Sequence, residues 1–433
     1  MGFLLRSGLV MLATFALFPS LAAADEPGER RPETASTRPI AELLAEVPLI
    51  DGHNDLIIHY VDWEKWALKP ATAYDISKTT PGQSDIPRMR QGSLGAAIFT
   101  IWTADDNAPE PGLESSIALF RELAARNPSD LAIVTTPDEL VAAHRSGKIA
   151  MMLGLEGGNP VEGDLSRLGW MKERGVAEMG LVWSSNGIGT AGRAAQNESG
   201  LTDLGRDVVR EMNRLGLIID LSHASPRTVL DVAAITKAPV IDTHAIVGTF
   251  GAGGRTLGYG DTALADEAML AIAGTGGVVM PMFMPDAIDA EYRAWMKRRN
   301  TELAAVATRI MGAEEAQNVI DFLPWPEAVE PDMQAWLAAN PPPAIKISGI
   351  ADVYDRARKI VGIDHIGIGS DFDGMGFNTS SWHPGLKDVS QVPLLLEELR
   401  ARGWSDDDLK KLAGGNFLRA WRQILAQAEA PHN

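Results

Sequence analysis

The sequence predicts an α/β fold, a (β/α)8 barrel in which eight parallel strands alternate with helices. Eight short apolar runs of strand length are spaced along the chain, and amphipathic stretches of helical length separate most of them. Histidines and carboxylates follow several of these runs, and barrel enzymes carry their functional residues at the C-terminal ends of the strands. This alternation also permits an open, doubly wound sheet, but the number of runs favours the closed barrel.

The predicted strands are residues 47–51, 96–102, 149–155, 179–183, 217–221, 239–243, 277–281 and 365–369. The clearest helical patterns between them cover residues 114–126, 204–215 and 226–235. A segment from residue 286 to residue 346 contains Trp, Met and Pro and is longer than a plain helical connection. We expect it to form a helical insertion beside the barrel mouth, within one barrel domain that spans residues 40–428.

The N-terminus has the layout of a secretory signal peptide. Arg6 precedes an apolar stretch at residues 8–17, and small residues, Ala22 and Ala24, stand three and one positions before Asp25. We therefore predict a cleaved leader at residues 1–24, a flexible lead-in at residues 25–39, and export to the periplasm or the medium. An uncleaved membrane anchor is the alternative, but the apolar stretch is short for a bilayer, so we expect no stable anchor.

Composition narrows the function classes further. The formal net charge of -18 argues against nucleic acid or an anionic membrane surface as a partner, since both require clustered Lys and Arg. The chain has no Cys, which excludes disulfides and thiolate nucleophiles or ligands. Any metal site must therefore be built from His, Asp and Glu.

Five candidate metal ligands follow four of the predicted strands. They are His53 and Asp55 in LIDGHNDL, Glu156 in LGLEGG, His223 in IIDLSHAS and His244 in VIDTHA. Some of these residues have an ordinary alternative role. Glu156 could instead cap the next helix, and His223 or His244 could instead be a structural residue. In a barrel, however, the strand ends converge on one face, so these residues would share one site. Five ligands exceed the need of one tetrahedral zinc and suit two ions bridged by a carboxylate.

Two further strand-end features fit a hydrolytic site. Asp371 and Asp373 in GSDFDG are expected to share a face, and we choose Asp371, nearer the strand, as the proton-transfer residue. Asp373 is the alternative that serves the loop. Arg255 lies in the glycine-rich loop GAGGRT, where a guanidinium suits bidentate capture of a substrate carboxylate. A surface salt bridge is the other interpretation of Arg255.

These motifs together resemble the membrane (renal) dipeptidase family, a branch of the metal-dependent amidohydrolase barrels. LIDGHNDL, LGLEGG, NRLGLIIDLSHAS, APVIDTHA and HIGIGSDFDG occur in the family's order, and the resemblance runs from about residue 40 to residue 425, interrupted near residues 286–346. It implies that His53 and Asp55 bind one zinc, that His223 and His244 bind the other, and that Glu156 bridges the two. It also implies that Arg255 holds the C-terminal carboxylate of a dipeptide and that Asp371 transfers the proton.

The chain departs from the family at Trp183. Family members commonly carry a histidine in a stretch like LTHSCN, which binds substrate and steadies the developing oxyanion, whereas the matching stretch here is LVWSSN. An indole donates one hydrogen bond but cannot become a cation. We therefore place Trp183 in the substrate-binding region and expect it to affect turnover and leave metal binding unchanged.

The expected function is hydrolysis of the amide bond of dipeptides, or of similar small carboxylate-bearing amides, by a hydroxide held between two zinc ions. One alternative is hydrolysis of another small amide or a lactone at the same site. A second is a metal-binding protein that has lost catalysis, which the presence of Trp183 would favour. Family members often form homodimers, so a homodimer is a possible assembly.

Overall fold

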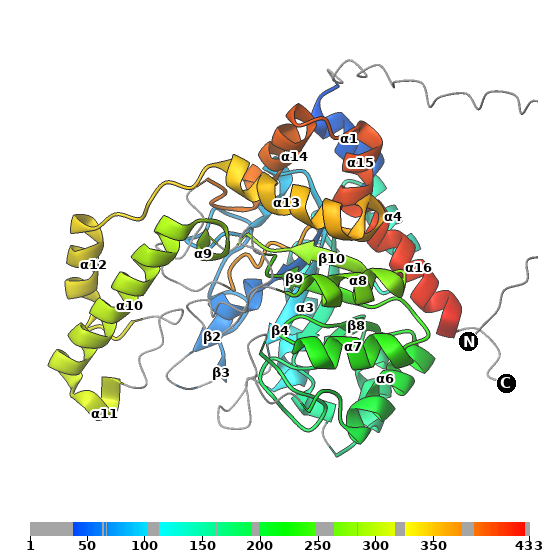
Figure 1. Cartoon of the computed structure of the whole chain (residues 1–433), viewed down its shortest axis with the longest axis horizontal. Helices are drawn as coiled ribbons and strands as arrows, with labels where there is room; N and C mark the ends of the chain where they lie inside the picture. The colour runs from blue at the N-terminus through cyan, green and yellow to red at the C-terminus, as the bar shows by residue number, and fades with distance from the viewer. Residues whose placement is uncertain are drawn as a thin grey trace, which may run out of the picture. The chain divides into compact units, whose positions relative to one another are not determined.

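The computed structural model shows parallel strands surrounded by helices (Figure 1). It describes residues 38–62, 65, 67–102, 112–161, 163–192, 199–247, 264–283, 285–316, 325–374 and 385–428. The strands are β1 (Leu49–Asn54), β2 (Val61–Asp62), β3 (Ala67–Leu68), β4 (Leu94–Trp102), β5 (Leu131–Ile133), β6 (Ile149–Glu156), β7 (Glu178–Gly180), β8 (Ile218–Asp220), β9 (Ile241–Ala245) and β10 (Val278–Pro281).

The longer helices lie between these strands and after them. They are α1 (Ile40–Glu46), α2 (Ile86–Gln91), α3 (Leu113–Arg126), α4 (Pro137–Arg145), α5 (Ser166–Glu173), α6 (Asp203–Leu215), α7 (Pro226–Ile235), α8 (Asp266–Gly274), α9 (Pro285–Ile288), α10 (Ala290–Met311), α11 (Ala313–Ala316), α12 (Glu330–Ala339), α13 (Ile347–Val361), α14 (Val392–Ala401), α15 (Asp406–Lys410) and α16 (Asn416–Ala428). A 3-10 helix, η1 (Leu56–Tyr60), follows β1 directly. A π-helical turn, η6 (Lys411–Gly415), joins α15 to α16.

Two four-stranded parallel sheets form the barrel wall. Their strand orders are β1-β4-β6-β5 and β10-β9-β8-β7. A parallel bridge between Leu153 and Val176 joins β6 to the start of β7. On the other side, the chain around residues 366–372 bridges Val279 of β10 and residues 51 and 54 of β1. Seven of these strands, all except β5 at the edge of its sheet, therefore close into a ring with the segment around residues 366–372. The predicted (β/α)8 barrel of eight parallel segments is confirmed.

The eighth segment differs from the expected strand. Residues 365–369 form isolated bridges through Ile366 and Ile368 and no continuous ladder. Gly369 explains the irregularity, because a Cβ atom there would lie 1.7 Å from the carbonyl oxygen of Thr243. The backbone thus passes too close to β9 for any side chain, and this close approach brings the residues after Gly369 against the end of β1.

Alternation along the strands divides the core into two faces. On β4, Ala97, Phe99 and Ile101 belong to the cluster that packs under the helices. Ala96 and Ile98 point the other way, into the barrel, and their cluster also contains Trp421 of α16. Thr100 is the next residue on the interior face, and it contacts a candidate ligand instead of an apolar neighbour. The barrel interior therefore changes from apolar to polar toward the strand ends, as a period of two residues requires.

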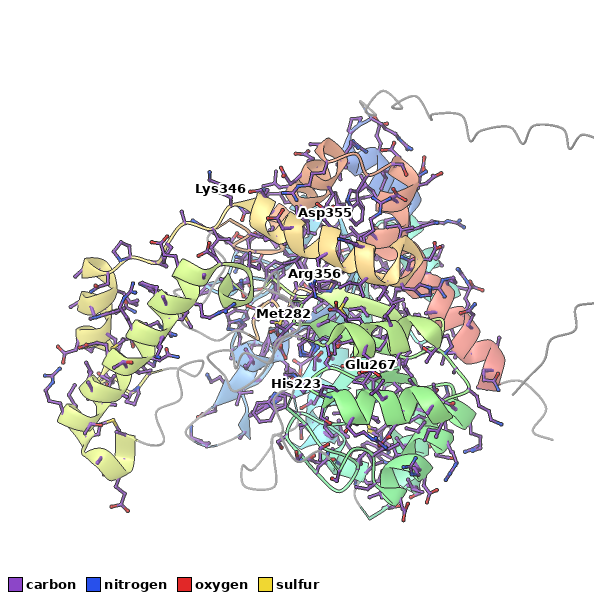
Figure 2. All side chains as sticks on the ribbon, in the orientation of Figure 1. His223, Glu267, Met282, Lys346, Asp355 and Arg356 are labelled. Atoms are coloured by element: carbon purple, nitrogen blue, oxygen red, sulfur yellow. The ribbon has the colours of Figure 1, made fainter. Side chains whose placement is uncertain are left out.

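The segment between β10 and α13 is helical in its described parts, as the sequence predicted. In Figure 1, α10, α11 and α12 lie together, and α10 and α12 share a small apolar cluster of their own, which includes Leu303, Val306 and Met333. The exact domain boundaries stay a prediction. Helix α13 returns to the barrel, where Arg356 forms an ion pair with Asp266 of α8 at 2.5 Å (Figure 2).

The described residues belong to one compact unit, Ala35–Asn433. Among the helices described, none has the length and the apolar content that crossing a bilayer requires.

Candidate metal-binding active site

A β-bulge presents the first pair of candidate ligands. Between Asp51 and Asn54, β1 has one more residue than the facing stretch of β4, so the pairing shifts at His53. Asp55 then begins the 3-10 helix η1 instead of extending the strand. The Nε2 atom of His53 nevertheless lies 3.2 Å from Oδ2 of Asp55. The two residues meet as predicted, but a bulge and a helical turn bring them together, in place of a regular extended strand.

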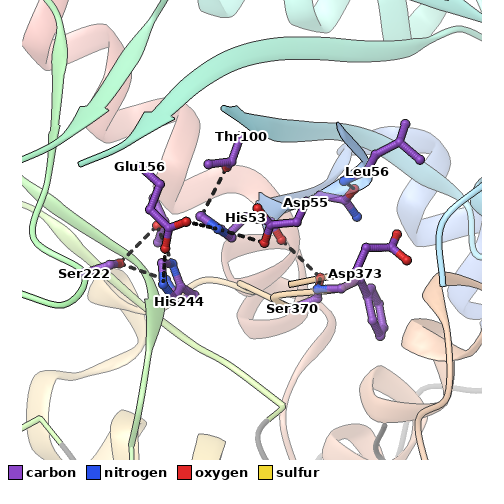
Figure 3. A network of polar contacts seen from close by, with 12 residues as sticks. His53, Asp55, Leu56, Thr100, Glu156, Ser222, His244, Ser370 and Asp373 are labelled. Atoms are coloured by element: carbon purple, nitrogen blue, oxygen red, sulfur yellow. Dashed lines mark hydrogen bonds and ion pairs between the residues drawn. The ribbon is translucent and has the colours of Figure 1, made fainter. Parts of the chain in front are cut away.

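Glu156 ends β6 with its two carboxylate oxygens facing different partners (Figure 3). Oε2 lies 3.8 Å from Nε2 of His53. Oε1 lies 2.7 Å from Nε2 of His223 and 3.5 Å from Nε2 of His244. One carboxylate oxygen thus faces His53, which pairs with Asp55, and the other faces His223 and His244, while donor atoms of His53, Glu156 and His244 all lie within 4.8 Å of one another.

The second group comes from the ends of β8 and β9. His223 follows β8 (Figure 2) in a left-handed conformation with φ of 61°, and His244 lies within β9. Their Nε2 atoms are 2.8 Å apart. The left-handed backbone of His223 costs on the order of 1–3 kcal/mol and persists because the surrounding structure enforces it.

Threonine hydroxyls orient two of the histidines. Thr100 Oγ1 lies 3.2 Å from Nδ1 of His53, and Thr243 Oγ1 lies 3.0 Å from Nδ1 of His244. When each Nδ1–H donates to its threonine, the lone pair on Nε2 points into the site. This is the outer-shell arrangement that fixes a metal-binding imidazole in protein sites.

Burial and charge shift the pKa values of these groups. Burial alone would lower the pKa of His53, but the carboxylates of Asp55 and Glu156 outweigh it and raise that pKa well above its ordinary value. Burial would raise the pKa of Glu156, yet His53 and His223 lower it below the ordinary value. The site is thus a buried region of negative potential that favours positive charge at the histidine nitrogens.

Zinc fits this donor set. Two donor atoms on one tetrahedral zinc lie roughly 3.3 Å apart, given Zn–N and Zn–O bonds of about 2.0–2.2 Å. The separations of 3.2 Å between His53 and Asp55 and of 3.5 Å between His244 and Glu156 are close to that value. His223 lies closer, at 2.8 Å from His244 and 2.7 Å from Glu156, so its ring would move outward to share an ion with them. In addition, within the described parts of the chain the buried Nε2 atom of His53 makes no hydrogen bond of normal geometry, although Oδ2 of Asp55 lies 3.2 Å away. A buried nitrogen without a hydrogen bond is costly unless another ligand takes its lone pair.

Asp371 also reaches this site, whereas Asp373 does not. Single donor atoms of His53, Asp55 and Asp371 all lie within 4.8 Å of one another. The pKa of Asp371 is raised well above its ordinary value by burial and by the nearby charges of Asp55 and Glu156. Asp373 instead lies on the other side of Asp55 from Glu156 in Figure 3. The expectation that Asp371 and Asp373 share a face was wrong, because both have left-handed backbone, with φ of 58° and 69°, and form a turn.

Trp183 lies beside the site, and a second indole accompanies it. Its ring centroid is 6.2 Å from that of His223 and 5.2 Å from that of Trp102, with the two indoles edge to face. Trp102 is paired with Glu156 across β4 and β6, so both tryptophans border the ligand group of His223. Arg255 lies outside the described residues.

Sequence reasoning missed Trp102, Thr100 and Thr243. Thr100 and Trp102 lie at the end of a predicted strand, and Thr243 directly precedes a candidate ligand, so their positions could have marked them. Their residue types carried no signal, because threonine and tryptophan are common on strands.

A closed parallel barrel that gathers histidines and carboxylates at its strand ends defines the class of barrel metallohydrolases. Residues 37–433 match the family model described as membrane dipeptidase, peptidase family M19, so the chain belongs to that family. This confirms the family that the sequence motifs indicated.

Curated relatives and solved structures agree with this assignment. Dipeptidase 3 of Rattus norvegicus is 30% identical over 392 residues, which cover 88% of this chain and 66% of the relative. Dipeptidase 3 of Homo sapiens is 30% identical over 404 residues, which cover 91% and 68% respectively. The chain thus spans about two thirds of the length of the curated relatives it matches.

Among solved structures, the probable dipeptidase PvdM from Pseudomonas aeruginosa is 27% identical, with a TM-score of 0.68 over 90% of this chain and 98% of that one. A metallo peptidase from Rhodobacter sphaeroides, liganded with a phosphinate mimic of the dipeptide L-Ala-D-Ala, is 20% identical, with a TM-score of 0.61 over 87% and 99%. The second likeness shows the fold alone.

Proposed function

We propose that this protein is a dipeptidase that hydrolyses its substrate with two zinc ions. The observation that carries the proposal is the division of ligands by Glu156, whose Oε2 faces His53 and whose Oε1 faces His223 and His244. A carboxylate placed between two ligand groups is the arrangement that a bridged pair of ions requires. Zinc bound there would lower the pKa of a water molecule and polarise the scissile carbonyl.

The chain's own residues supply the remaining chemistry. Asp371 takes a proton in the pocket and passes it to the leaving amine, and its raised pKa fits a group that alternates between protonated and ionised states. Trp102 and Trp183 form an apolar wall on the side of the site nearest His223, against which a substrate would pack. Arg255, by resemblance to the family, binds the carboxylate at the substrate's C-terminus.

Dipeptides are the proposed substrates because one amide bond and one free carboxylate satisfy both the metal site and Arg255. Membership of the membrane dipeptidase family supports the same substrate class. The test is turnover of a dipeptide panel by purified, zinc-loaded protein, with carboxylate-free dipeptide amides as controls. Equal turnover of the amides would favour the alternative of a general small-amide or lactone hydrolase.

Trp183 favours a second candidate, a metal-binding protein with weak or lost catalysis. Where the family has a histidine that can donate to the oxyanion, this chain has an indole packed against Trp102. Zinc-loaded protein that binds two ions but turns over no member of the panel would support this candidate.

Replacing Trp183 with histidine is expected to raise turnover of a simple L,L-dipeptide. An oxyanion donor is worth on the order of 3 kcal/mol, or roughly 100-fold in kcat. Steady-state kinetics of wild type and Trp183→His on one panel measure the gain, and the zinc content should stay equal. Trp102→His is the matched control, because it also exchanges an indole for an imidazole beside the site but at a different strand end. Rapid turnover by the wild type, with no gain in the variant, would show that Trp183 does not limit catalysis.

We also infer export, from the leader-like pattern at residues 1–24. Expression in a Gram-negative host should give mature protein in the periplasm or medium that begins near Asp25, as N-terminal sequencing would show. Intact Met1 on membrane-bound material would contradict this inference.

A further inference from the structure

Asp373 is held by a reciprocal pair of hydrogen bonds with Gln83. The backbone N–H of Asp373 donates to Oε1 of Gln83 at 2.9 Å, and the backbone N–H of Gln83 donates to Oδ1 of Asp373 at 2.6 Å. The side-chain amide of Gln83 also donates to the carbonyl oxygen of Lys387 at 2.9 Å. Both side chains are buried. A buried pair bonded in both directions fixes backbone position on both sides, although Oδ2 of Asp373 has no hydrogen-bond partner among the described residues.

A histidine adds a third contact to the same carboxylate. Nε2 of His59, in helix η1, lies 2.8 Å from Oδ1 of Asp373. The His59 ring stacks on Tyr74 with a centroid separation of 4.6 Å and an interplanar angle of 3°. The Tyr74 hydroxyl accepts a hydrogen bond from the backbone N–H of Gly82 at 2.8 Å. His59 is therefore held by the same segment that carries Gln83.

The turn that these contacts hold is strained. Asp371 and Asp373 have φ of 58° and 69°, a conformation that costs a non-glycine residue on the order of 1–3 kcal/mol. Gly374 completes the turn, and a Cβ atom there would lie 2.2 Å from both Oδ1 of Asp371 and Oδ2 of Asp55. The place of the Asp371 carboxyl group thus depends on a backbone shape that the two aspartates do not prefer by themselves.

We propose that Asp373, clamped by Gln83 and His59, is a positioning residue that holds Asp371 in its left-handed conformation facing the metal ligands. The proposal rests on the proposed role of Asp371 in proton transfer. Asp373 itself contacts none of the candidate ligands, and its effect on the reaction passes through the turn.

Asp373→Ala tests this clamp. It should lower kcat by about 10- to 100-fold, the usual effect of losing an outer contact that orients a functional group, with KM and zinc content nearly unchanged. Asp373→Asn retains an Oδ1 acceptor for the Gln83 N–H and should restore most of the rate. In an Asp371→Asn background, Asp373→Ala should cost nothing more, because the group that it positions is already absent. Additive losses in that background would overturn the proposal, as would a full rate in Asp373→Ala.

A crystal structure of Asp373→Ala gives a readout that does not depend on activity. We expect residue 371 to leave the left-handed region, whereas an unchanged φ there would overturn the proposal even if the wild type hydrolyses no dipeptide. His59→Phe keeps an aromatic ring to stack on Tyr74 and removes the hydrogen bond to Asp373. If Asp373→Ala does not fold, this milder variant carries the test, with an expected loss of kcat of about 10-fold and the same shift at residue 371.

Discussion

Asp371→Asn is expected to retain both zinc ions and to lose roughly 100- to 10,000-fold in kcat, the usual contribution of a positioned general acid or base. The asparagine keeps the size and shape of the side chain but cannot exchange a proton at neutral pH. In the structure, donor atoms of Asp371, His53 and Asp55 lie within 4.8 Å of one another, and burial together with the charges of Asp55 and Glu156 raises the pKa of Asp371. It is therefore placed and tuned to move a proton inside the pocket.

Steady-state kinetics together with metal analysis check this result, and Asp373→Asn is the control. That variant should lose far less, because Asp373 faces Gln83 and His59. A larger loss in Asp373→Asn would show that the wrong carboxylate was chosen. A fall in zinc content in Asp371→Asn would instead make Asp371 a ligand, since its donor atom lies within 4.8 Å of those of His53 and Asp55.

Glu156→Gln is expected to lower zinc occupancy at both positions and, with it, nearly all hydrolysis. Each oxygen of Glu156 faces a different ligand group, and an amide offers only one oxygen while its NH2 group can only donate. The variant therefore removes the bridging carboxylate. His223→Ala should chiefly empty one position, because His223 belongs to one group only. Metal analysis after dialysis against a weak chelator should find about two ions per chain in the wild type, about one in His223→Ala and close to none in Glu156→Gln.

Glu178→Gln is the matched control for Glu156→Gln. Glu178 is a second buried glutamate of the barrel interior, and burial and the nearby Asp220 raise its pKa well above the ordinary value. The raised pKa favours the neutral form of Glu178, so a neutral amide of the same shape replaces it with little electrostatic change. The zinc content of Glu178→Gln should match that of the wild type. If Glu156→Gln also keeps its ions, or if wild type binds only one firmly, the two-ion proposal is wrong.

The sequence by itself determined the fold class and the kinds of residues at the site. Short apolar runs separated by helical patterns are a local property of the chain, and the barrel follows from their repetition. Because the chain has no Cys, the ligands were restricted to His, Asp and Glu. The convergence of parallel strand ends then brought residues as distant as His53 and His244 to one face, where the structure places their rings 3.9 Å apart.

Only the tertiary structure decided which neighbours hold these residues in place. The hydrogen bond between Gln83 and Asp373 joins residues 290 positions apart, and the contact between His59 and Asp373 joins residues 314 apart. Local periodicity carries no information about such pairs, because they arise where irregular segments cross after the strands have closed. The separation of Asp371 from Asp373 has the same origin. An extended strand would point both carboxylates the same way, but the contacts with Gln83 and His59 enforce a left-handed turn, and the turn directs only Asp371 to the ligands.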